Sequence, residues 1–291
     1  MWIFYMILSI LCISMTTIIS KLAMEHAHYH VFNALRTIFI VVTAWIIVFF
    51  VGSGQSISML SAETWWYLII SGVTTALAWT FFYKALQMTE VRKVIPIDSS
   101  NVVIAVIFGV LLLGDIPTIT TIISMITISF GIIMMIQRGS KESKKKKESR
   151  KWIIWAFLGA VFTALTNVFG SMWACQVEVN LGAAIRVLII LIIMLGILFF
   201  SKNYPKVKDV DRKGWIFIGI TGILTVLSWF LFNLSLIGSL EVGMSNVVSI
   251  SGELSIVTTL FLSFLILKEK ISKRAIVGVV QYIIGILVMI F

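Results

Sequence analysis

Charged side chains are scarce in this chain. Asp, Glu, Lys and Arg make up only 12% of its 291 residues, whereas hydrophobic residues make up 59%. A soluble domain carries about 25% charged residues, because its surface has to be hydrated. This composition excludes an ordinary water-soluble protein and predicts a chain whose main solvent is lipid.

Proline and cysteine are also rare, with three and two copies. Cys12 and Cys175 fall in or beside apolar stretches where no partner thiol is expected, which argues against a disulfide framework. The first residues enter an apolar run with no basic region before it and no small-residue cleavage site after it. We therefore expect this run to stay in the mature protein.

Motifs of soluble catalysis are missing as well. The sequence has no serine nucleophile elbow, no phosphate-cradling glycine loop and no paired-histidine zinc motif. His26, His28 and His30 alternate in a short loop, but no second group of ligands follows with the spacing of a tetrahedral metal site. We expect a hydrated loop there, no cofactor, and neither an enzyme nor an ATP-driven pump.

Long hydrophobic runs are what the sequence has in abundance. A helix needs about 20 apolar residues to cross the hydrocarbon core. The runs are continuous rather than alternating, which favours helices over strands, since a helix satisfies its own backbone polar groups inside lipid. The sequence predicts an all-α integral membrane protein with ten transmembrane helices, at residues 2–20, 31–51, 65–86, 94–113, 118–137, 152–174, 181–200, 214–237, 243–267 and 274–291.

The longest polar stretch, the basic segment 138–151, reads as a solvated linker between two nearly equal halves, 1–137 and 152–291. Uncommon residues of the two halves coincide when one half is placed over the other. At an offset of 150 residues the matches include Trp2 with Trp152, Arg36 with Arg186 and Trp79 with Trp229, and at 154 they include Asp115 with Glu269 and Gly131 with Gly285. We predict an internal duplication of a five-helix unit.

An odd number of helices per unit predicts that the second unit is inserted upside down. This is the inverted-repeat design of secondary transporters, in which two units rock about a site near the membrane midplane. The charge distribution predicts the orientation: with Arg36 counted in the first loop, every one of the 23 basic residues except Arg186 belongs to an odd-numbered loop or to a helix end beside one. These loops are predicted to be cytoplasmic, with both termini outside the cell membrane. The net charge of +10 is therefore read as topological rather than as a sign of a nucleic-acid partner.

Three short elements carry a family resemblance. The third predicted helix is rich in aromatic residues and ends in Tyr83-Lys84-Ala85-Leu86, Pro96 opens the fourth, and a Leu-Gly-acid hairpin ending at Asp115 leads into the fifth. In order and spacing, these elements resemble the EamA-type members of the drug/metabolite transporter superfamily. The second half repeats them more loosely, without a proline at the place of Pro96 and with Lys268 in place of Gly114.

The resemblance covers essentially the whole chain. It implies a basket of helices around a central cavity lined by helices 1, 3, 4, 6, 8 and 9, with the fifth and tenth helices at the periphery. It also implies export of amino acids, metabolites or toxic organic compounds, or import of nutrients, without hydrolysis of ATP.

Ionisable residues inside the predicted spans are functional candidates, because a charge at the bilayer centre costs about 2.5–3.5 kcal/mol. Glu253 lies about ten residues into the ninth span, roughly 15 Å deep. We predict that it binds a proton or a cationic group of the substrate; the alternative is a neutral carboxyl hydrogen-bonded to Ser249 or to another helix. Asp98 either lines the pathway or pairs with Arg92 or Lys93 at the interface.

Aromatic and amide side chains complete the predicted site. Indole and phenol rings suit an amphipathic solute and can make cation–π contacts with an amine, although deep tryptophans can equally be structural. The predicted substrate-binding residues are Glu253, Trp79, Tyr83, Trp229, Asn233, Asp98, Asn101, Asn246 and Ser249.

Two further pairs have open interpretations. Arg36 and Arg186 are expected to anchor helices to lipid headgroups or to cap a neighbouring helix, with recognition of an anionic substrate group as the alternative. Gly278 and Gly285, seven residues apart, suit either close helix packing or a homodimer.

The leading prediction is a secondary active transporter that exports amino acids or related amphipathic or cationic metabolites, coupled to protons or to a counter-substrate. Its expected partners are this small-molecule substrate and the lipid bilayer. The alternative is an intramembrane lipid-handling or sensory protein without solute flux. An intramembrane enzyme would need a cluster of catalytic side chains at one interface, and the sequence has only isolated acids.

Overall fold

The computed structural model of the chain describes residues 1–52, 57–136, 150–201, 204–240, 242, 248 and 252–290. Every regular element in these ranges is helical. The longer helices are α1 (Trp2–His26), α2 (Tyr29–Val51), α3 (Ala62–Met88), α4 (Val91–Asp98), α5 (Asn101–Phe108), α6 (Ile119–Met135), α7 (Lys151–Ala174), α8 (Val179–Phe200), α9 (Arg212–Leu240), α11 (Ser255–Ile266) and α12 (Lys273–Ile290). Short turns of helix lie at η1 (Ile57–Met59), η2 (Gly109–Leu113), η4 (Tyr204–Asp209) and η5 (Gly252–Leu254).

Seven helical stretches of the described chain are long and apolar enough to cross a membrane, the run Val91–Leu113 among them. Two shorter apolar helices, Ile119–Met135 and Gly252–Ile266, and the 18-residue α12 lie within or on the other predicted spans. The first part of the ninth predicted span, 243–251, lies outside the described residues except for position 248. Several helices extend past the predicted ends, as α1 does to His26, because the hydrogen-bonded ladder continues beyond the apolar stretch. The predicted linker lies outside the described residues except for its last two positions.

The fourth span is broken in its middle. Pro96, which the sequence places near its start, lies inside α4, and the helix stops at Asp98 before α5 begins at Asn101. Proline removes a backbone donor and disturbs the preceding turn. Side chains at the break satisfy nearby carbonyls: the Ser99 hydroxyl donates to the Ile95 carbonyl at 2.7 Å, and the Asn101 amide donates to the Asp98 carbonyl at 2.7 Å. The break therefore sets polar groups in the middle of an apolar span.

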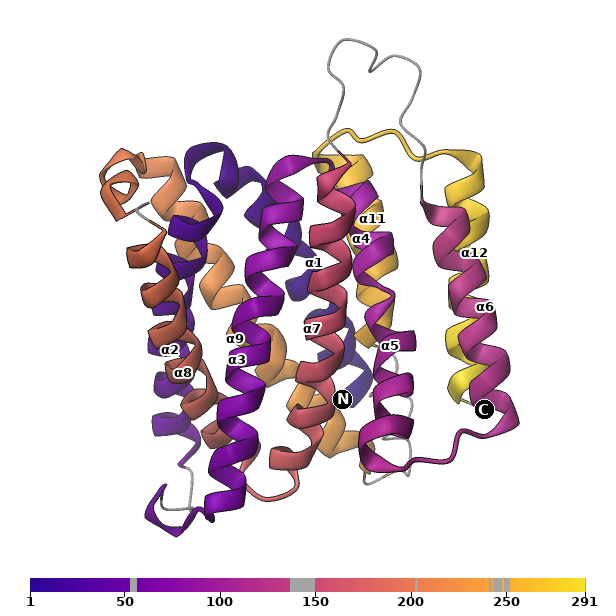
Figure 1. The fold of residues 1–291 in the computed structure, drawn as a ribbon, viewed down its shortest axis with the longest axis horizontal. Coiled ribbons are helices and arrows are strands. Elements are labelled where there is room, and N and C mark those ends of the chain that lie inside the picture. The colour runs from indigo at the N-terminus through magenta and orange to yellow at the C-terminus, as the bar shows by residue number, and fades with distance from the viewer. Residues whose placement is uncertain are drawn as a thin grey trace.

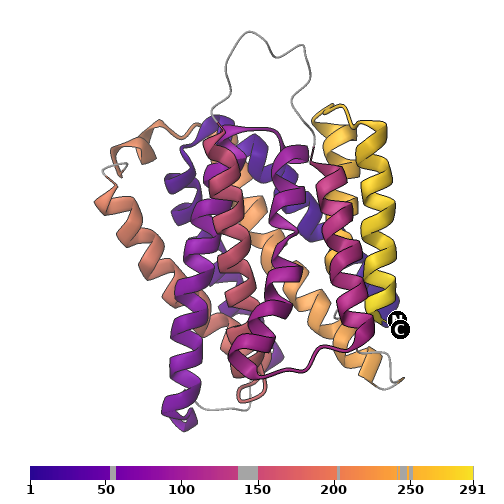
Figure 2. The same ribbon diagram turned by 45° about the vertical axis from the view of Figure 1, so that its right-hand side comes forward.

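The helices run side by side and alternate in direction (Figures 1 and 2). Met1 and the end of α12 lie at one end of the bundle, called here the terminal end. The end of α6 and the start of α7 lie at the opposite end, called here the linker end. The turns that follow α1, α3 and α11 also lie at the linker end.

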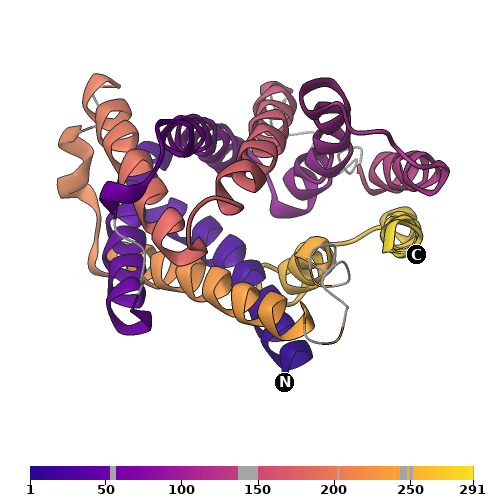
Figure 3. The same cartoon turned by 90° about the horizontal axis from the view of Figure 1, so that it is seen from below.

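Helices of one half pack mainly on helices of the other. The most extensive contacts join α1 to α9, α3 to α7, α6 to α12 and α2 to α8. Seen from the terminal end, α6 and α12 form a pair at one side of the bundle (Figure 3). Large apolar side chains such as Phe49, Ile126 and Ile192 point outward, with 81%, 66% and 71% of their surface exposed. Such an apolar exterior suits contact with lipid rather than water.

Glycines bring α6 and α12 together within the chain. A Cβ on Gly131 would lie 2.8 Å from the carbonyl oxygen of Gly278, and a Cβ on Gly278 would lie 2.7 Å from that of Gly131. Gly285 likewise faces Ile128, at 2.7 Å. Of the two interpretations of the glycine stripe, close helix packing is the one that the structure supports, and the stripe is not free for a second copy. The homodimer itself stays a prediction.

The turns after the fourth and ninth spans have the same geometry. Gly114 adopts φ 73°, and Lys268, which replaces it in the second half, adopts φ 56°. In each turn the amide of the following acid donates six residues back: Asp115 to the Gly109 carbonyl and Glu269 to the Ser263 carbonyl, at 3.3 and 3.2 Å. A lysine in this left-handed region is strained, since its Cβ crowds the backbone.

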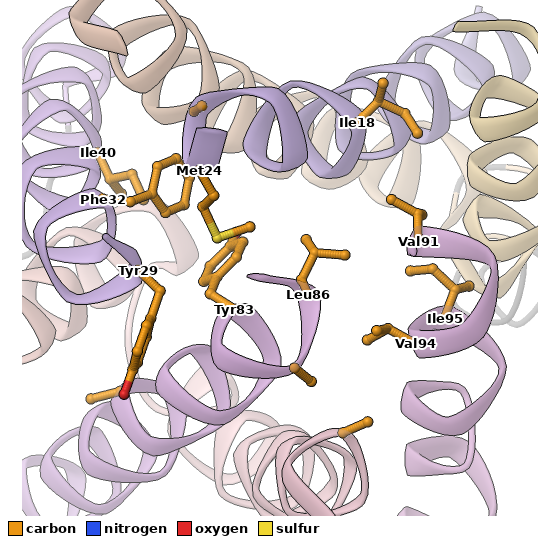
Figure 4. Packing of buried hydrophobic residues seen from close by; sticks show 14 of the residues in the cluster. Ile18, Met24, Tyr29, Phe32, Ile40, Tyr83, Leu86, Val91, Val94 and Ile95 are labelled. Atoms are coloured by element: carbon orange, nitrogen blue, oxygen red, sulfur yellow. The ribbon is translucent and has the colours of Figure 1, made fainter. Parts of the chain in front are cut away.

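Buried apolar side chains fill the bundle near the linker end. The helices α1 to α4 contribute Ile18, Met24, Phe32, Tyr83, Leu86, Val91, Val94 and Ile95 to this cluster (Figure 4), and α6 to α9, α11 and α12 add further members.

Candidate functional site

A cavity of about 430 Å³ lies in the centre of the bundle. It is lined by α1, α3, α4, α5, α7, α9, η5 and α11, which are the helices that the family resemblance implies, and α2 adds Arg36. A cavity of this size can hold a small organic molecule. Hydroxyl and amide groups form much of its wall, from Ser9, Thr16, Thr17, Thr163, Asn167, Thr225, Ser228 and Thr259.

Six of the predicted site residues line this cavity: Trp79, Tyr83, Asp98, Asn101, Trp229 and Glu253. Asn233 does not. It borders a space of about 20 Å³ between α2, α8 and α9, because one turn beyond Trp229 the surface of α9 packs on its neighbours. This corrects the prediction that Asn233 is a substrate-binding residue. Asn246 and Ser249 lie outside the described residues.

The two acids carry no ion pair in the described part of the chain. Glu253, on η5, accepts a hydrogen bond from the Tyr282 hydroxyl of α12 at 3.4 Å. Asp98, at the end of α4, has a buried Oδ1 with no hydrogen-bond donor among the described residues. The alternative pairing of Asp98 with Arg92 or Lys93 is wrong, since Glu90 pairs with both of these cations, at 2.7 and 3.6 Å.

Arg36 is only 2% exposed and faces the cavity, so the prediction that it anchors α2 to lipid headgroups is wrong. Its Nη2 donates to the Thr225 hydroxyl at 2.7 Å, which ties α2 to α9. The guanidinium carbon lies 4.6 Å from the ring centre of Trp79 and 5.2 Å from that of Tyr83. Nε and Nη1 have no acceptor in the described structure.

The matching arginine of the second half has a related environment outside the cavity. Arg186 donates to the Ser71 hydroxyl at 3.4 Å and lies 5.6 Å from the Trp229 ring and 5.4 Å from the Trp173 ring. It too points inward rather than toward headgroups. A cation–π contact stabilises by about 0.5–2 kcal/mol. Each contact thus offsets only part of the cost of about 2.5–3.5 kcal/mol for a cation inside the membrane.

Several lining residues were missed by sequence reasoning or left unassigned. Thr225 and Ser228 belong to a series on α9, with Thr221, that recurs every three or four residues and so marks one helix face. Ser228 and Ser9 donate to each other's carbonyl oxygens, at 3.1 and 2.9 Å, and clamp α9 to α1. Tyr282 had a weaker signal, as the single tyrosine of α12, directly after Gln281 in an otherwise apolar stretch.

A second cavity, of about 450 Å³, adjoins the first. Asn167 and Glu253 line both. Its other walls come from α5, α6, α7, α12 and the 109–117 segment, which includes Asp115 at the terminal end. The two cavities together lead from the middle of the bundle toward the terminal end.

The linker end is closed by polar contacts above the apolar cluster. Lys21 Nζ donates to the carbonyl oxygens of Leu86 and Thr89, both at 2.6 Å. Glu269 accepts from the backbone amides of Val91 and Arg92, at 2.9 and 2.8 Å, and so caps α4 from the opposite half of the chain. Burial raises the pKa of Glu269, and the two amides oppose this shift.

The chain belongs to the EamA-like transporter family, whose model matches residues 1–137 and again 150–291. It is therefore a multi-pass membrane transporter and not an enzyme, and the predicted resemblance is confirmed. An uncharacterized transporter in the cobO 3′ region of Sinorhizobium sp is 29% identical over 141 residues, which are 48% of this chain and 97% of the relative.

Two further similarities cover more of the chain. The probable glucose uptake protein GlcU of Priestia megaterium is 27% identical over 236 residues, with 76% of this chain and 75% of that protein covered. A protein of known crystal structure has the same fold, with a TM-score of 0.66 at 14% identity, and the match covers 98% of this chain and 94% of that one.

Proposed function

We propose that this protein is a secondary active transporter that exports a small amino-bearing metabolite, such as an amino acid or a related amphipathic or cationic compound. The observation that carries the proposal is that two carboxylates, Asp98 and Glu253, line one cavity together with Trp79 and Trp229 and form no ion pair among the described residues. Carboxylates attract an ammonium group, and indole faces attract both cations and apolar bodies.

Alternating access would follow from two inverted five-helix units. In support, the first helix of each unit packs on the third helix of the other, as α1 does on α9 and α7 on α3. The second and the fifth helices pair with their own counterparts. The family model also matches each half separately. Rocking of such units exposes a midplane site to the two sides in turn.

The basic residues support a cytoplasmic linker end and outer termini in the cell membrane. With that orientation, the closed linker end and the cavities leading toward the terminal end correspond to an outward-facing state. Glu253 borders both cavities and is the candidate for coupling, either by carrying a proton or by exchanging one substrate for another.

Flux into proteoliposomes tests the proposal. Amino acids, polyamines and quaternary amines are offered with and without a proton gradient, together with D-glucose because one relative is named for glucose uptake. Saturable flux of an amino-bearing solute, lowered by Asp98→Asn and absent from protein-free liposomes, is expected. Flux of glucose alone would contradict the substrate class. No saturable flux of any solute would favour the lipid-handling or sensory alternative. Efflux from preloaded cells tests the direction of transport. Cells that express the protein should lose the transported solute faster than cells that lack it.

A further inference from the structure

One cation in the central cavity is left unexplained by an amine-binding site. Arg36 is buried, lines the cavity, and keeps Nε and Nη1 without acceptors among the described residues. Asp98 and Glu253 line the same cavity, yet neither forms an ion pair with it in the described structure. A buried donor without an acceptor calls for a specific explanation, and a role in ligand binding is one.

The surroundings of Arg36 hold its guanidinium in place. Thr225 fixes Nη2 by a hydrogen bond of 2.7 Å, and the ring centre of Trp79 lies 4.6 Å from the guanidinium carbon. A ring stacked on the guanidinium covers its face, whereas the N–H donors point outward in its plane. Nε and Nη1 are buried in this state, so a ligand reaches them only when the surrounding side chains move.

The chemistry of the cavity selects the kind of anion. A guanidinium recognises planar carboxylates through two parallel hydrogen bonds. A doubly charged phosphate is disfavoured here, because the carboxylates of Asp98 and Glu253 share the space and a like charge repels it. A carboxylate that belongs to the same molecule as an ammonium group satisfies both signs of charge at once.

We propose that Arg36 is a carboxylate-binding subsite of the central cavity, opposite in charge to an ammonium subsite at Asp98 and Glu253. This inference rests on the proposed function and narrows its substrates to zwitterions that carry both groups. Arg186 occupies the equivalent position of the second half but does not line the cavity, so it serves as a matched control.

Competition for flux into proteoliposomes tests the subsite. L-Alanine, L-leucine and L-phenylalanine are each compared with the methyl ester and with the decarboxylated amine. Wild-type protein should prefer the free amino acid by about 10- to 100-fold, the range expected for hydrogen bonds to a charged group. Arg36→Gln should remove this preference while the amine still moves, and Arg186→Gln should keep it.

Several results would overturn the subsite. If wild-type protein transports the esters and amines at the same rate as the free amino acids, it does not recognise the carboxylate. An Arg36→Gln variant that retains the preference, or that slows every compound equally, makes Arg36 a structural residue. If Arg36→Gln does not fold, Arg36→Lys and Thr225→Val take its place. Each should weaken the preference about tenfold, because each loses part of the planar hydrogen-bonding geometry, and an unchanged preference in both contradicts the subsite.

The failure of the subsite differs from the failure of the proposed function. If wild-type protein transports amines but ignores the carboxylate, only the subsite is wrong. If wild-type protein moves no amino-bearing solute, the proposed function fails, and the subsite fails with it.

Discussion

The indole rings of Trp79 and Trp229 stack across the middle of the bundle, with centroids 6.3 Å apart and planes inclined by 22°. They hold equivalent positions in the two halves, and each lies beside the arginine of its own half, Arg36 or Arg186. The stack joins α3 to α9 at the wall of the central cavity. One pair of side chains thus both lines the cavity and connects the halves.

Replacement of Trp79 by leucine is expected to weaken solute binding and to lower stability. The change removes the aromatic stack, which contributes about 0.5–1.5 kcal/mol, and the support for the Arg36 guanidinium. Flux at varied solute concentration should show a raised KM. Trp66→Leu is the control, since this tryptophan is 62% exposed on the outside of the bundle. Equal effects of both substitutions would remove Trp79 from the site.

Replacement of Glu253 by glutamine tests the coupling role. The amide keeps a partner for Tyr282 but cannot bind or release a proton. Transport driven by a proton gradient should be lost, and the dependence of flux on pH should flatten, with unchanged expression. Asp115→Asn, at the far wall of the second cavity, should leave both intact. If the Glu253→Gln variant retains pH-dependent transport, proton coupling through this residue is excluded.

Glu269→Ala should both destabilise the protein and open the linker end. Loss of the cap of α4 is expected to cost about 1 kcal/mol, and Glu269→Gln should cost less, since the amide oxygen still accepts one backbone hydrogen bond. Thermal unfolding in detergent reports the loss of stability. Faster labelling of a cysteine introduced at position 91, where Val91 is buried, reports the opening of the linker end.

Glu178→Ala provides the comparison for this prediction. Glu178 caps α8 in the same way, accepting from the amides of Asn180 and Leu181 at 2.9 and 2.8 Å, but it does so at the terminal end and within its own helical hairpin. It should lower stability without exposing the linker end. Similar labelling in both variants would show that Glu269 does not hold the linker end closed.

Gly131→Ala should separate α6 from α12. The added Cβ would meet backbone atoms 2.8 Å away, and overpacking of this kind costs about 1–3 kcal/mol. Gly196→Ala on α8 is the matched control, because no atom lies within 4 Å of its added Cβ. Alanine also has a higher helix propensity than glycine, so the Gly196→Ala control should be neutral or slightly stabilising. A thermal shift of equal sign in both would contradict the packing role of Gly131.

Cysteine labelling in intact cells tests the inverted arrangement. Cys12 is buried and Cys175 is exposed. An impermeant maleimide is expected to label Cys175 from outside, whereas a cysteine introduced at position 143 in a Cys175→Ser background should react only after the cells are opened. Labelling of both positions from the same side would refute the antiparallel insertion of the two halves.

The sequence alone predicted the helical spans, their approximate ends and the family. Each of these three features follows from the composition of a continuous stretch or from the order of short motifs. None of them requires knowledge of contacts between distant parts of the chain. Pro96 also marks the region in which the fourth span is broken, and α4 ends two residues beyond it, at Asp98.

Apart from the hydroxyl-bearing face of α9, only the tertiary structure decided which side of a helix faces the cavity. Arg36 points inward beside Trp79, Asn233 turns away, Tyr282 reaches Glu253 from α12, and the glycine stripe is occupied by α6. In a soluble protein the contrast between a polar exterior and an apolar core would reveal these faces. Lipid is as apolar as a protein core, so helices here are hydrophobic all round, and packing between the two halves determines the cavity.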